Sequence, residues 1–263
     1  MASTLSDALE IVVRTDPGMI RELNEDAVFA NPVRGFVILA DGMGGYNAGE
    51  VASGMATSFL SSALETSFFD SIPARENEPG EKSLAHRCVL DSIARANTAI
   101  YNAAVSEPQF SGMGTTLVTA LFHDNRVTVA HIGDSRLYCL RDDVLSIVTR
   151  DHSLLQEQID SGVITAEEAR YSQNKNLVTR ALGVEPSVEP EINEYPVRPG
   201  DIYLFCSDGL NDMLQDDEIQ LVLQTLAVNL ELAARQLIQM ANDNGGRDNI
   251  SVILVKILRA FPA

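Results

Sequence analysis

Aspartates stand in four segments where the chain leaves or enters an apolar run: VILADGMGG, VAHIGDSR, IYLFCSDGLND and GGRDNIS. Hard divalent cations such as Mg²⁺ and Mn²⁺ prefer oxygen ligands, and a glycine beside an aspartate lets a backbone carbonyl approach an ion. Each Asp-Gly pair alone is more often a plain turn than a ligand. Because a rigid scaffold commonly presents functional residues at strand ends, the repetition indicates a metal site. Its candidates are Asp41, Gly42, Asp134, Asp208, Asp212 and Asp248.

Six apolar runs rich in β-branched residues are typical of strands, and turn residues bound them. The two runs beside Gly133-Asp134-Ser135 predict an antiparallel hairpin, which argues against an all-parallel sheet. We therefore expect a sheet that is antiparallel at least in part. The predicted strands cover residues 36–40, 115–122, 127–132, 136–140, 201–206 and 250–258.

Apolar residues recur with helical spacing at residues 51–69, 84–105 and about 230–241, which predicts three amphipathic helices. The polar segment 70–82 contains two prolines and predicts a connection between the first two helices, not a domain boundary. From Asp151 to Asn176 the chain is polar with weak helical signals, among which Thr165 and Glu168 match a capping box.

The composition predicts one globular domain with a sizeable core. The 263 residues are 45% hydrophobic, and no flexible linker divides them. With 37 acidic and 19 basic residues, the net charge of −18 disfavours binding to nucleic acid and to anionic membranes. The N-terminal segment lacks the features of a signal peptide, so we expect a cytoplasmic protein. The cysteines lack metal or redox spacing and are expected to be buried: Cys88, Cys139 and Cys206.

Seven motifs in a fixed order cover nearly the whole chain, and together they resemble the PPM, or type 2C, metal-dependent protein phosphatases in their compact bacterial form. The motifs are RELNEDA (21–27), DGMGGYNAGEVAS (41–53), SGMGTT (111–116), GDSR (133–136), TRALG (179–183), SDGLND (207–212) and GRDN (246–249). The resemblance implies an α+β fold in which a central antiparallel β-sandwich is flanked by helices on both sides, in four αββα layers. Residues 1–263 would form this single domain, with the metals in a cleft at one end.

The resemblance also implies a role for each matching residue. Arg21, four residues before Glu25, matches the family's phosphate-binding arginine, and a guanidinium fork suits two phosphate oxygens. Its alternative role is a surface ion pair. Among the implied metal residues, Asp41 is the carboxylate that bridges the two core ions, and Gly42 is a carbonyl ligand. Asp208 and Asp248 complete the shell of one ion, whereas Glu25 and Asp26 hold the second ion largely through its waters. Asp134 and Asp212, with Asp208, match a third metal site.

The implied cofactors are two or three divalent ions, Mn²⁺ or Mg²⁺. Two such ions about 3.5–4 Å apart lower the pKa of a bridging water, and the hydroxide attacks phosphorus in line. The substrates would be phosphoserine and phosphothreonine, and no covalent enzyme intermediate is required. Met43 stands where some family members carry a histidine that protonates the leaving group, so the general acid stays open. We assign no role to His131 or His152.

The implied partners are phosphorylated proteins and a cognate Ser/Thr kinase, which the enzyme would oppose in bacterial signalling as a monomer. The segment 153–176 matches a mobile flap beside the cleft of the family. Its apolar stripe is thin, so little burial opposes local opening.

Three other classes compete with this prediction. A catalytically inactive binding module on the same fold would require lost metal ligands, whereas every ligand position is filled here. A phosphohydrolase with an aspartyl nucleophile needs Asp-x-Asp after the first strand, and Met43 stands at the second position. A nucleotide phosphate loop needs a Gly-Lys-Ser/Thr ending, which GMGG lacks.

Overall fold

A computed structural model of the protein describes residues 5–45, 48–69, 82–169, 172 and 177–261. The helix connection predicted at 70–82 lies outside these residues except for its last position, and the predicted flap at 153–176 is described only in part.

The strands form two sheets, and all neighbouring strands in the described part of the chain are antiparallel. The first sheet has the order β1-β11-β10-β7-β8, and the second has the order β2-β3-β5-β6-β9, with β4 beside β3. The first sheet comprises β1 (Leu9–Asp16), β11 (Ile250–Ile257), β10 (Ile202–Cys206), β7 (Arg136–Arg141) and β8 (Val144–Ile147). The second comprises β2 (Asp26–Asn31), β3 (Phe36–Met43), β4 (Gly114–Thr115), β5 (Leu117–His123), β6 (Arg126–Ile132) and β9 (Glu191–Pro196).

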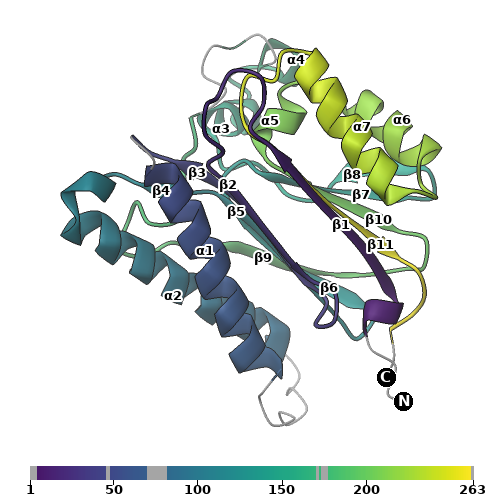
Figure 1. The fold of residues 1–263 in the computed structure, drawn as a ribbon, viewed down its shortest axis with the longest axis horizontal. Coiled ribbons are helices and arrows are strands. Elements are labelled where there is room, and N and C mark those ends of the chain that lie inside the picture. Colours follow the sequence, from purple (N-terminus) through teal and green to yellow (C-terminus); the bar gives the residue numbers. More distant parts are fainter. Residues whose placement is uncertain (1–4, 46–47, 70–81, 170–171, 173–176, 262–263) are drawn as a thin grey trace.

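Helices cover the outer face of each sheet, which gives four layers (Figure 1). The second sheet packs against α1 (Ala48–Leu64) and α2 (Leu84–Ser106). The first sheet packs against α5 (Asp208–Asn211), α6 (Asp216–Thr225) and α7 (Leu230–Asp243). Two short helices, α3 (Leu154–Asp160) and α4 (Ala166–Ala169), precede β9. The predicted α+β class, with a central antiparallel sandwich and helices on both sides, is confirmed.

Alternation along β3 shows why its sequence is apolar without interruption. Phe36, Ile38 and Ala40 face the layer of α1 and α2, whereas Val37 and Leu39 face the other sheet. Successive side chains of a strand point to opposite faces, so a strand with cores on both sides needs apolar residues at every position.

The predicted hairpin around Gly133-Asp134-Ser135 is wrong, because the strands on its two sides belong to different sheets. β6 pairs with β5 and β9, whereas β7 pairs with β10 and β8. Apolar runs buried on both faces suit the inside of two packed sheets as well as a hairpin, and periodicity does not separate the two cases. Gly133, with φ of 99°, starts the link that carries the chain from one sheet to the other.

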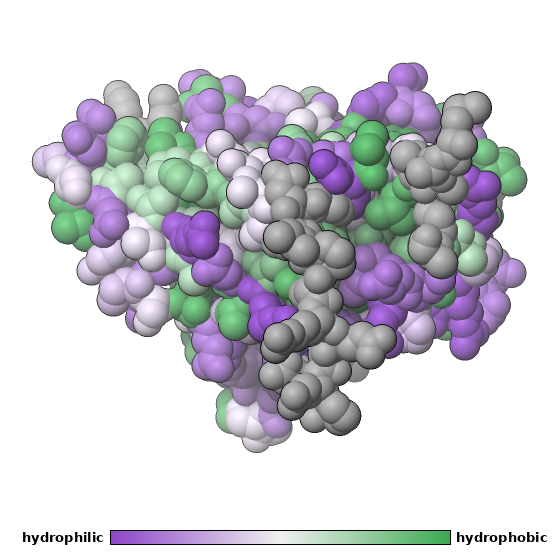
Figure 2. Space-filling model, turned by 90° about the horizontal axis from the view of Figure 1, so that it is seen from below, coloured by the Kyte–Doolittle hydropathy of each residue, from purple (hydrophilic) through white to green (hydrophobic). Residues whose placement is uncertain are grey.

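The outer surface mixes polar and apolar residues. On the face shown in Figure 2, hydrophobic residues are interspersed with hydrophilic ones. Exposed large apolar side chains come from separate elements, for example Val105 in α2, Val144 in β8 and Leu221 in α6. Among the residues that the structure describes, no helix combines the length and the apolar character needed to cross a membrane.

Candidate metal centre

The aspartates singled out from the sequence meet at one end of the sandwich. Asp41 lies near the end of β3 and is paired in register with Asp26, which opens β2. Asp208 follows β10 as the first residue of α5, and Asp248 lies two residues before β11. Because one strand of an antiparallel pair ends where its neighbour begins, residues distant in the sequence converge at this end.

Asp41 and Gly42, expected just after the strand, are part of β3. The Asp41 N–H donates to Thr116 Oγ1 (3.1 Å), and the Asp41 carbonyl accepts from the Thr116 N–H (2.8 Å). The Gly42 N–H donates to the Glu25 carbonyl (3.1 Å). A Cβ at position 42 would lie 2.1 Å from the Gly49 carbonyl oxygen, so the close approach of α1 requires glycine here.

Glu25 places its carboxylate at the N-terminus of α1. The N–H groups of Gly49 and Glu50 donate to it, where the helix dipole favours a negative charge. Burial nevertheless raises the pKa of Glu25 above its usual value. The Glu25 carboxylate therefore has a fixed position before any ion is considered.

Asp26 leaves one of its oxygens without a partner. Ser207 Oγ donates to Asp26 Oδ2 (2.8 Å), but Asp26 Oδ1 is buried and accepts no hydrogen bond from the described residues. Burial raises the pKa of Asp26 to about 6. A cation, or a water bound to one, would satisfy this oxygen.

The aspartates at the centre of the cluster are buried and repel one another. Burial raises the pKa values of Asp41 and Asp208 well above the usual range, and the neighbouring carboxylates raise them further. Burial also raises the pKa of Asp134 to about 7, with Asp151 and Asp212 adding to the effect. Divalent cations would compensate both the burial and the repulsion, so this donor set fits them.

Arg21 brings a positive charge to the cluster. Its Nη2 lies 2.7 Å from Asp248 Oδ2, and 51% of its side chain is exposed. Asp248 in particular raises the pKa of the guanidinium, and Glu25 and Asp208 add to this shift. The ion pair considered as an alternative role thus exists, but its partner is itself a predicted metal ligand.

Most of the predicted site residues line a cleft of about 280 Å³, but Asp26 and Asp212 are not among its described lining residues. Asp26 is paired in register with Asp41. Asp212 follows α5 and donates its N–H to the Asp208 carbonyl (2.8 Å). The described lining residues are Arg21, Glu25, Asp41, Gly42, Met43, Gly44, Thr116, Asp134, Val178, Asp208 and Asp248.

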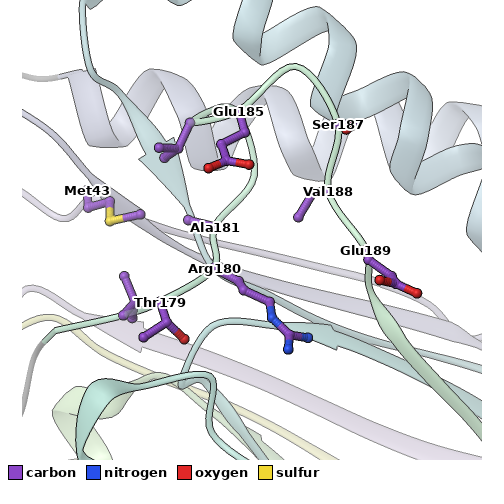
Figure 3. A pocket seen from close by; sticks show the side chains of 10 residues that line it. Met43, Thr179, Arg180, Ala181, Glu185, Ser187, Val188 and Glu189 are labelled. Atoms are coloured by element: carbon purple, nitrogen blue, oxygen red, sulfur yellow. The ribbon is translucent and has the colours of Figure 1, made fainter. Parts of the chain in front are cut away.

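A second pocket, of about 640 Å³, adjoins the cleft, since Met43 and Val178 line both (Figure 3). The Met43 thioether carries no proton that it could give to a leaving group. All four histidines of the chain lie in the described ranges, and none of them lines the cleft.

His131 and His152 form a separate, stacked pair with ring centroids 4.6 Å apart. His131 Nε2 donates to the Arg150 carbonyl (2.7 Å), and burial lowers the pKa of His152 to about 4, so its ring is neutral near pH 7. His131, His152 and Glu191 lie close enough to share an ion, but Arg180 Nη1 stands 3.4 Å from His152 Nε2. This guanidinium disfavours a cation, and the pair is structural.

Neutral polar residues that were not predicted from the sequence position the cluster. Asn249 accepts the Glu25 N–H (2.7 Å) and donates to the carbonyls of Pro17 and Leu23 (3.0 and 2.9 Å), so it holds the loop that carries Arg21. Thr116 and Ser207 hold Asp41 and Asp26 in the same way. The available signal was their place inside the GRDN, SGMGTT and SDGLND motifs.

Comparison with known sequences finds the protein phosphatase 2C family at residues 21–254. The chain is 42% identical over 247 residues to the serine/threonine phosphatase stp of Listeria innocua, which covers 92% of this chain and 94% of that protein. It is 40% identical over 251 residues to the serine/threonine protein phosphatase PstP of Mycobacterium tuberculosis, covering 95% of this chain. The chain spans less than half of PstP, 45% of its length.

Solved structures show the same similarity. The crystal structure of the M. tuberculosis serine/threonine phosphatase PstP matches with a TM-score of 0.83 and 39% identity, over 95% of this chain and 99% of that one. The catalytic domain of PstP in complex with two manganese ions matches with a TM-score of 0.80 and 39% identity, over 95% and 98%. A serine/threonine phosphatase of S. agalactiae matches with a TM-score of 0.82 and 36% identity, over 95% and 99%.

We predict that Mn²⁺ raises the melting temperature of the metal-free protein, because it compensates carboxylates that repel one another. At a free Mn²⁺ concentration 100-fold above Kd, the expected stabilisation is about 2.7 kcal/mol. Asp208→Asn removes one buried charge, so without metal it should melt above the wild type, and it should gain less from Mn²⁺. Scanning calorimetry at pH 8, in chelator and in Mn²⁺, measures both effects.

Asp142→Asn is the matched control. The Asp142 side chain is 85% exposed, and its left-handed backbone (φ 51°) is one that asparagine adopts readily. This variant should respond to Mn²⁺ as the wild type does. If Asp208→Asn gained as much from Mn²⁺ as the wild type, the cluster would not be the metal site.

Proposed function

The chain belongs to the protein phosphatase 2C family, and on that premise we propose that it removes phosphate from phosphoserine and phosphothreonine in proteins with the help of divalent metal ions. The family and the enzyme class predicted from the motifs are confirmed by its relatives. One observation carries the proposal for this chain: carboxylates from both sheets line a single cleft together with the guanidinium of Arg21.

Each predicted ligand has a role in this proposal. Asp41, Asp208 and Asp248, with the carbonyl of Gly42, would hold the two core ions. Glu25 and Asp26 would bind waters of the second ion, and Asp134 and Asp212 would extend the site to a third. When bound, the ions would activate a water for attack on phosphorus and offset the charge of the phosphate. The two manganese ions in the PstP structure support the assignment.

The chain's own residues bind the phosphate and fix the carboxylates. Arg21 lies at the cleft with about half of its side chain exposed, where its planar fork suits two oxygens of a phosphate. Thr116 fixes the backbone of Asp41 through two hydrogen bonds, and Ser207 Oγ donates to the Asp26 carboxylate. The orientation of these metal-binding residues is thus set before the substrate binds.

The cysteines take no part in this chemistry. All three are buried, and burial raises the pKa of the Cys139 thiol to about 11 and that of Cys206 to about 12. Burial also raises the pKa of Cys88. A thiol that stays protonated is a poor nucleophile, and attack by water needs none. Met43, which follows Gly42, has no proton to give to the leaving alkoxide.

Relatives named serine/threonine phosphatases support phosphorylated proteins as substrates. We propose phosphorylated proteins as substrates and a Ser/Thr kinase as the opposing enzyme. The cytoplasmic location and the monomeric state stay predictions from the sequence.

The proposed activity predicts hydrolysis of both a phosphothreonine peptide and p-nitrophenyl phosphate in Mn²⁺, and loss of both in excess chelator. Asp41→Asn and Asp208→Asn should each be folded and nearly inactive, because each removes a charge that holds the ions. Phosphate release measures the rates, and circular dichroism tests the fold. Activity that persists on protein shown to be metal-free would contradict the proposal, and a folded, metal-loaded protein without activity would favour the inactive binding module.

Arg21→Ala should weaken capture of the transition state by about 1.5–3 kcal/mol, the usual contribution of a hydrogen bond to a charged group. The measurement is kcat/KM for a phosphothreonine peptide, with the Mn²⁺-dependent rise in melting temperature retained. Arg14→Ala is the control, because Arg14 forms an exposed ion pair with Glu231 on α7. An unchanged kcat/KM in Arg21→Ala would exclude Arg21 from phosphate binding and leave its ion pair with Asp248 as its role.

We also propose that the segment 153–176 acts as a flap that selects protein substrates. Its base is fixed: Ser153 and Val178 form a bridge, and the Leu154 N–H donates to the Leu177 carbonyl (2.9 Å). Beyond the base, α3 contains no buried residue, and Asp160 pairs with Arg150 at its end. A segment with so little burial opens at low cost and lies on the chain just before Val178 of the cleft.

Substitutions in this flap should change kcat/KM for phosphopeptides much more than hydrolysis of p-nitrophenyl phosphate, because only a peptide is large enough to touch it. The variants are Glu157→Gln, Asp160→Asn and Glu167→Gln, the last at a side chain outside the described ones. Asp217→Asn on α6, an exposed carboxylate elsewhere on the surface, is the control. Equal effects on both substrates, or none on either, would remove the flap from substrate selection.

A further inference from the structure

The second pocket and the metal cleft share an apolar wall. Met43 lines both, and it is paired with Gly114 across β3 and β4. A Cβ at position 114 would lie 2.8 Å from Val184 Cγ2 and 3.1 Å from Met43 Cε, so both side chains pack over this glycine. Val184 is 52% exposed and also lines the pocket. A chain that leaves the cleft over Met43 therefore meets an apolar surface.

The loop on the other side of the pocket is held by α2. Asn97, which is 1% exposed, donates through Nδ2 to the Glu185 carbonyl (3.0 Å) and accepts the Gly183 N–H through Oδ1 (2.8 Å). Leu182 exchanges two backbone hydrogen bonds with Thr115 (2.8 and 3.1 Å). The loop is thus positioned without a ligand, and a binding partner would not have to order it.

The charged groups of the pocket are separated in space. Figure 3 shows Glu185 on the side of Met43, whereas the Arg180 side chain extends toward the side of Glu189. Arg180 Nη1 lies 3.4 Å from His152 Nε2, which directs the guanidinium at the histidine pair. The end of the pocket next to the cleft therefore combines the apolar Met43 and Val184 with the carboxylate of Glu185.

We propose that this end of the pocket binds a lysine or arginine side chain of the substrate, close in sequence to the phosphorylated residue; the inference rests on the proposed function. Such a side chain has an aliphatic stem, which packs on Met43 and Val184, and a cationic head, which Glu185 receives. Because the cleft and the pocket share a wall, one extended segment reaches both. The net charge of −18 also attracts a positively charged segment.

The test compares phosphothreonine peptides that differ only in lysine, glutamine or glutamate at one position within three residues of the phosphothreonine. For at least one position, the wild type should show a kcat/KM about tenfold higher with lysine than with glutamate, as partly exposed charge pairs allow. Glu185→Gln should lower that ratio about three- to fivefold. Hydrolysis of p-nitrophenyl phosphate, which has no side chain to place in the pocket, should stay within about twofold of the wild type.

Glu189→Gln is the control inside the same pocket, because Glu189 lies on the side of Arg180 (Figure 3). It should keep most of the preference for lysine. The subsite is wrong if the wild type shows no preference, if it prefers glutamate because Arg180 dominates, or if Glu185→Gln keeps the full ratio. In each of these cases turnover of p-nitrophenyl phosphate stays normal. Loss of all Mn²⁺-dependent turnover in the wild type would instead overturn the proposed function, and the subsite with it.

Discussion

Repulsion among carboxylates that are largely removed from water is the constraint around which this molecule is built. Burial and neighbouring charges raise the pKa values of Asp41, Asp208 and Asp134, so the polypeptide places ionisable groups where their charged forms are unfavourable. The chain compensates part of this itself, through Arg21 beside Asp248 and the N-terminus of α1 beside Glu25. The remaining repulsion calls for cations, and the proposed reaction requires the same cations.

Such a cluster persists only because the surrounding structure holds it rigidly. Asp26 and Asp41 belong to paired strands, and the strands that carry them have apolar side chains packed on both faces of their sheet. Hydrogen bonds to uncharged side chains then fix the site: Asn249 holds the Glu25 backbone, Thr116 the Asp41 backbone and Ser207 the Asp26 carboxylate. The sandwich thus fixes the positions of the acidic side chains, and a shell of neutral polar residues lies between them and the apolar core.

The sequence predicted the parts of the fold that have a strong local pattern. The central strands, with apolar residues on both faces, and the helices α1, α2 and α7 were found near their true bounds. The four strands without a predicted counterpart, β1, β2, β8 and β9, are the four edge strands of the two sheets. Apart from the buried Leu9, their side chains are half-buried or exposed, and their apolar runs are short, the longest being residues 11–13 in β1 and 27–30 in β2.

The candidate site also contains residues that the sequence predicted and features that it did not. Ordered motifs pointed to the acidic residues and to Arg21, because ion binding restricts which side chains can stand there. The hairpin at Asp134 was wrong because pairing depends on which sheet each strand joins, and local sequence does not contain that information. The pocket beside the cleft could not be predicted, since its walls come from β3 and from the loop that Asn97 holds, segments more than a hundred residues apart.

The pairing of β1 with β11 brings the two ends of the described chain together, and this has a consequence for how the molecule is made. Asn249 leaves the ribosome 224 residues after Glu25, yet it accepts the hydrogen bond that fixes the Glu25 backbone. Contacts of such long sequence separation form late, because the intervening chain must be ordered first. A nascent or truncated chain that lacks residues 248–257 therefore has no assembled centre, so the centre forms only after β11 has been synthesised.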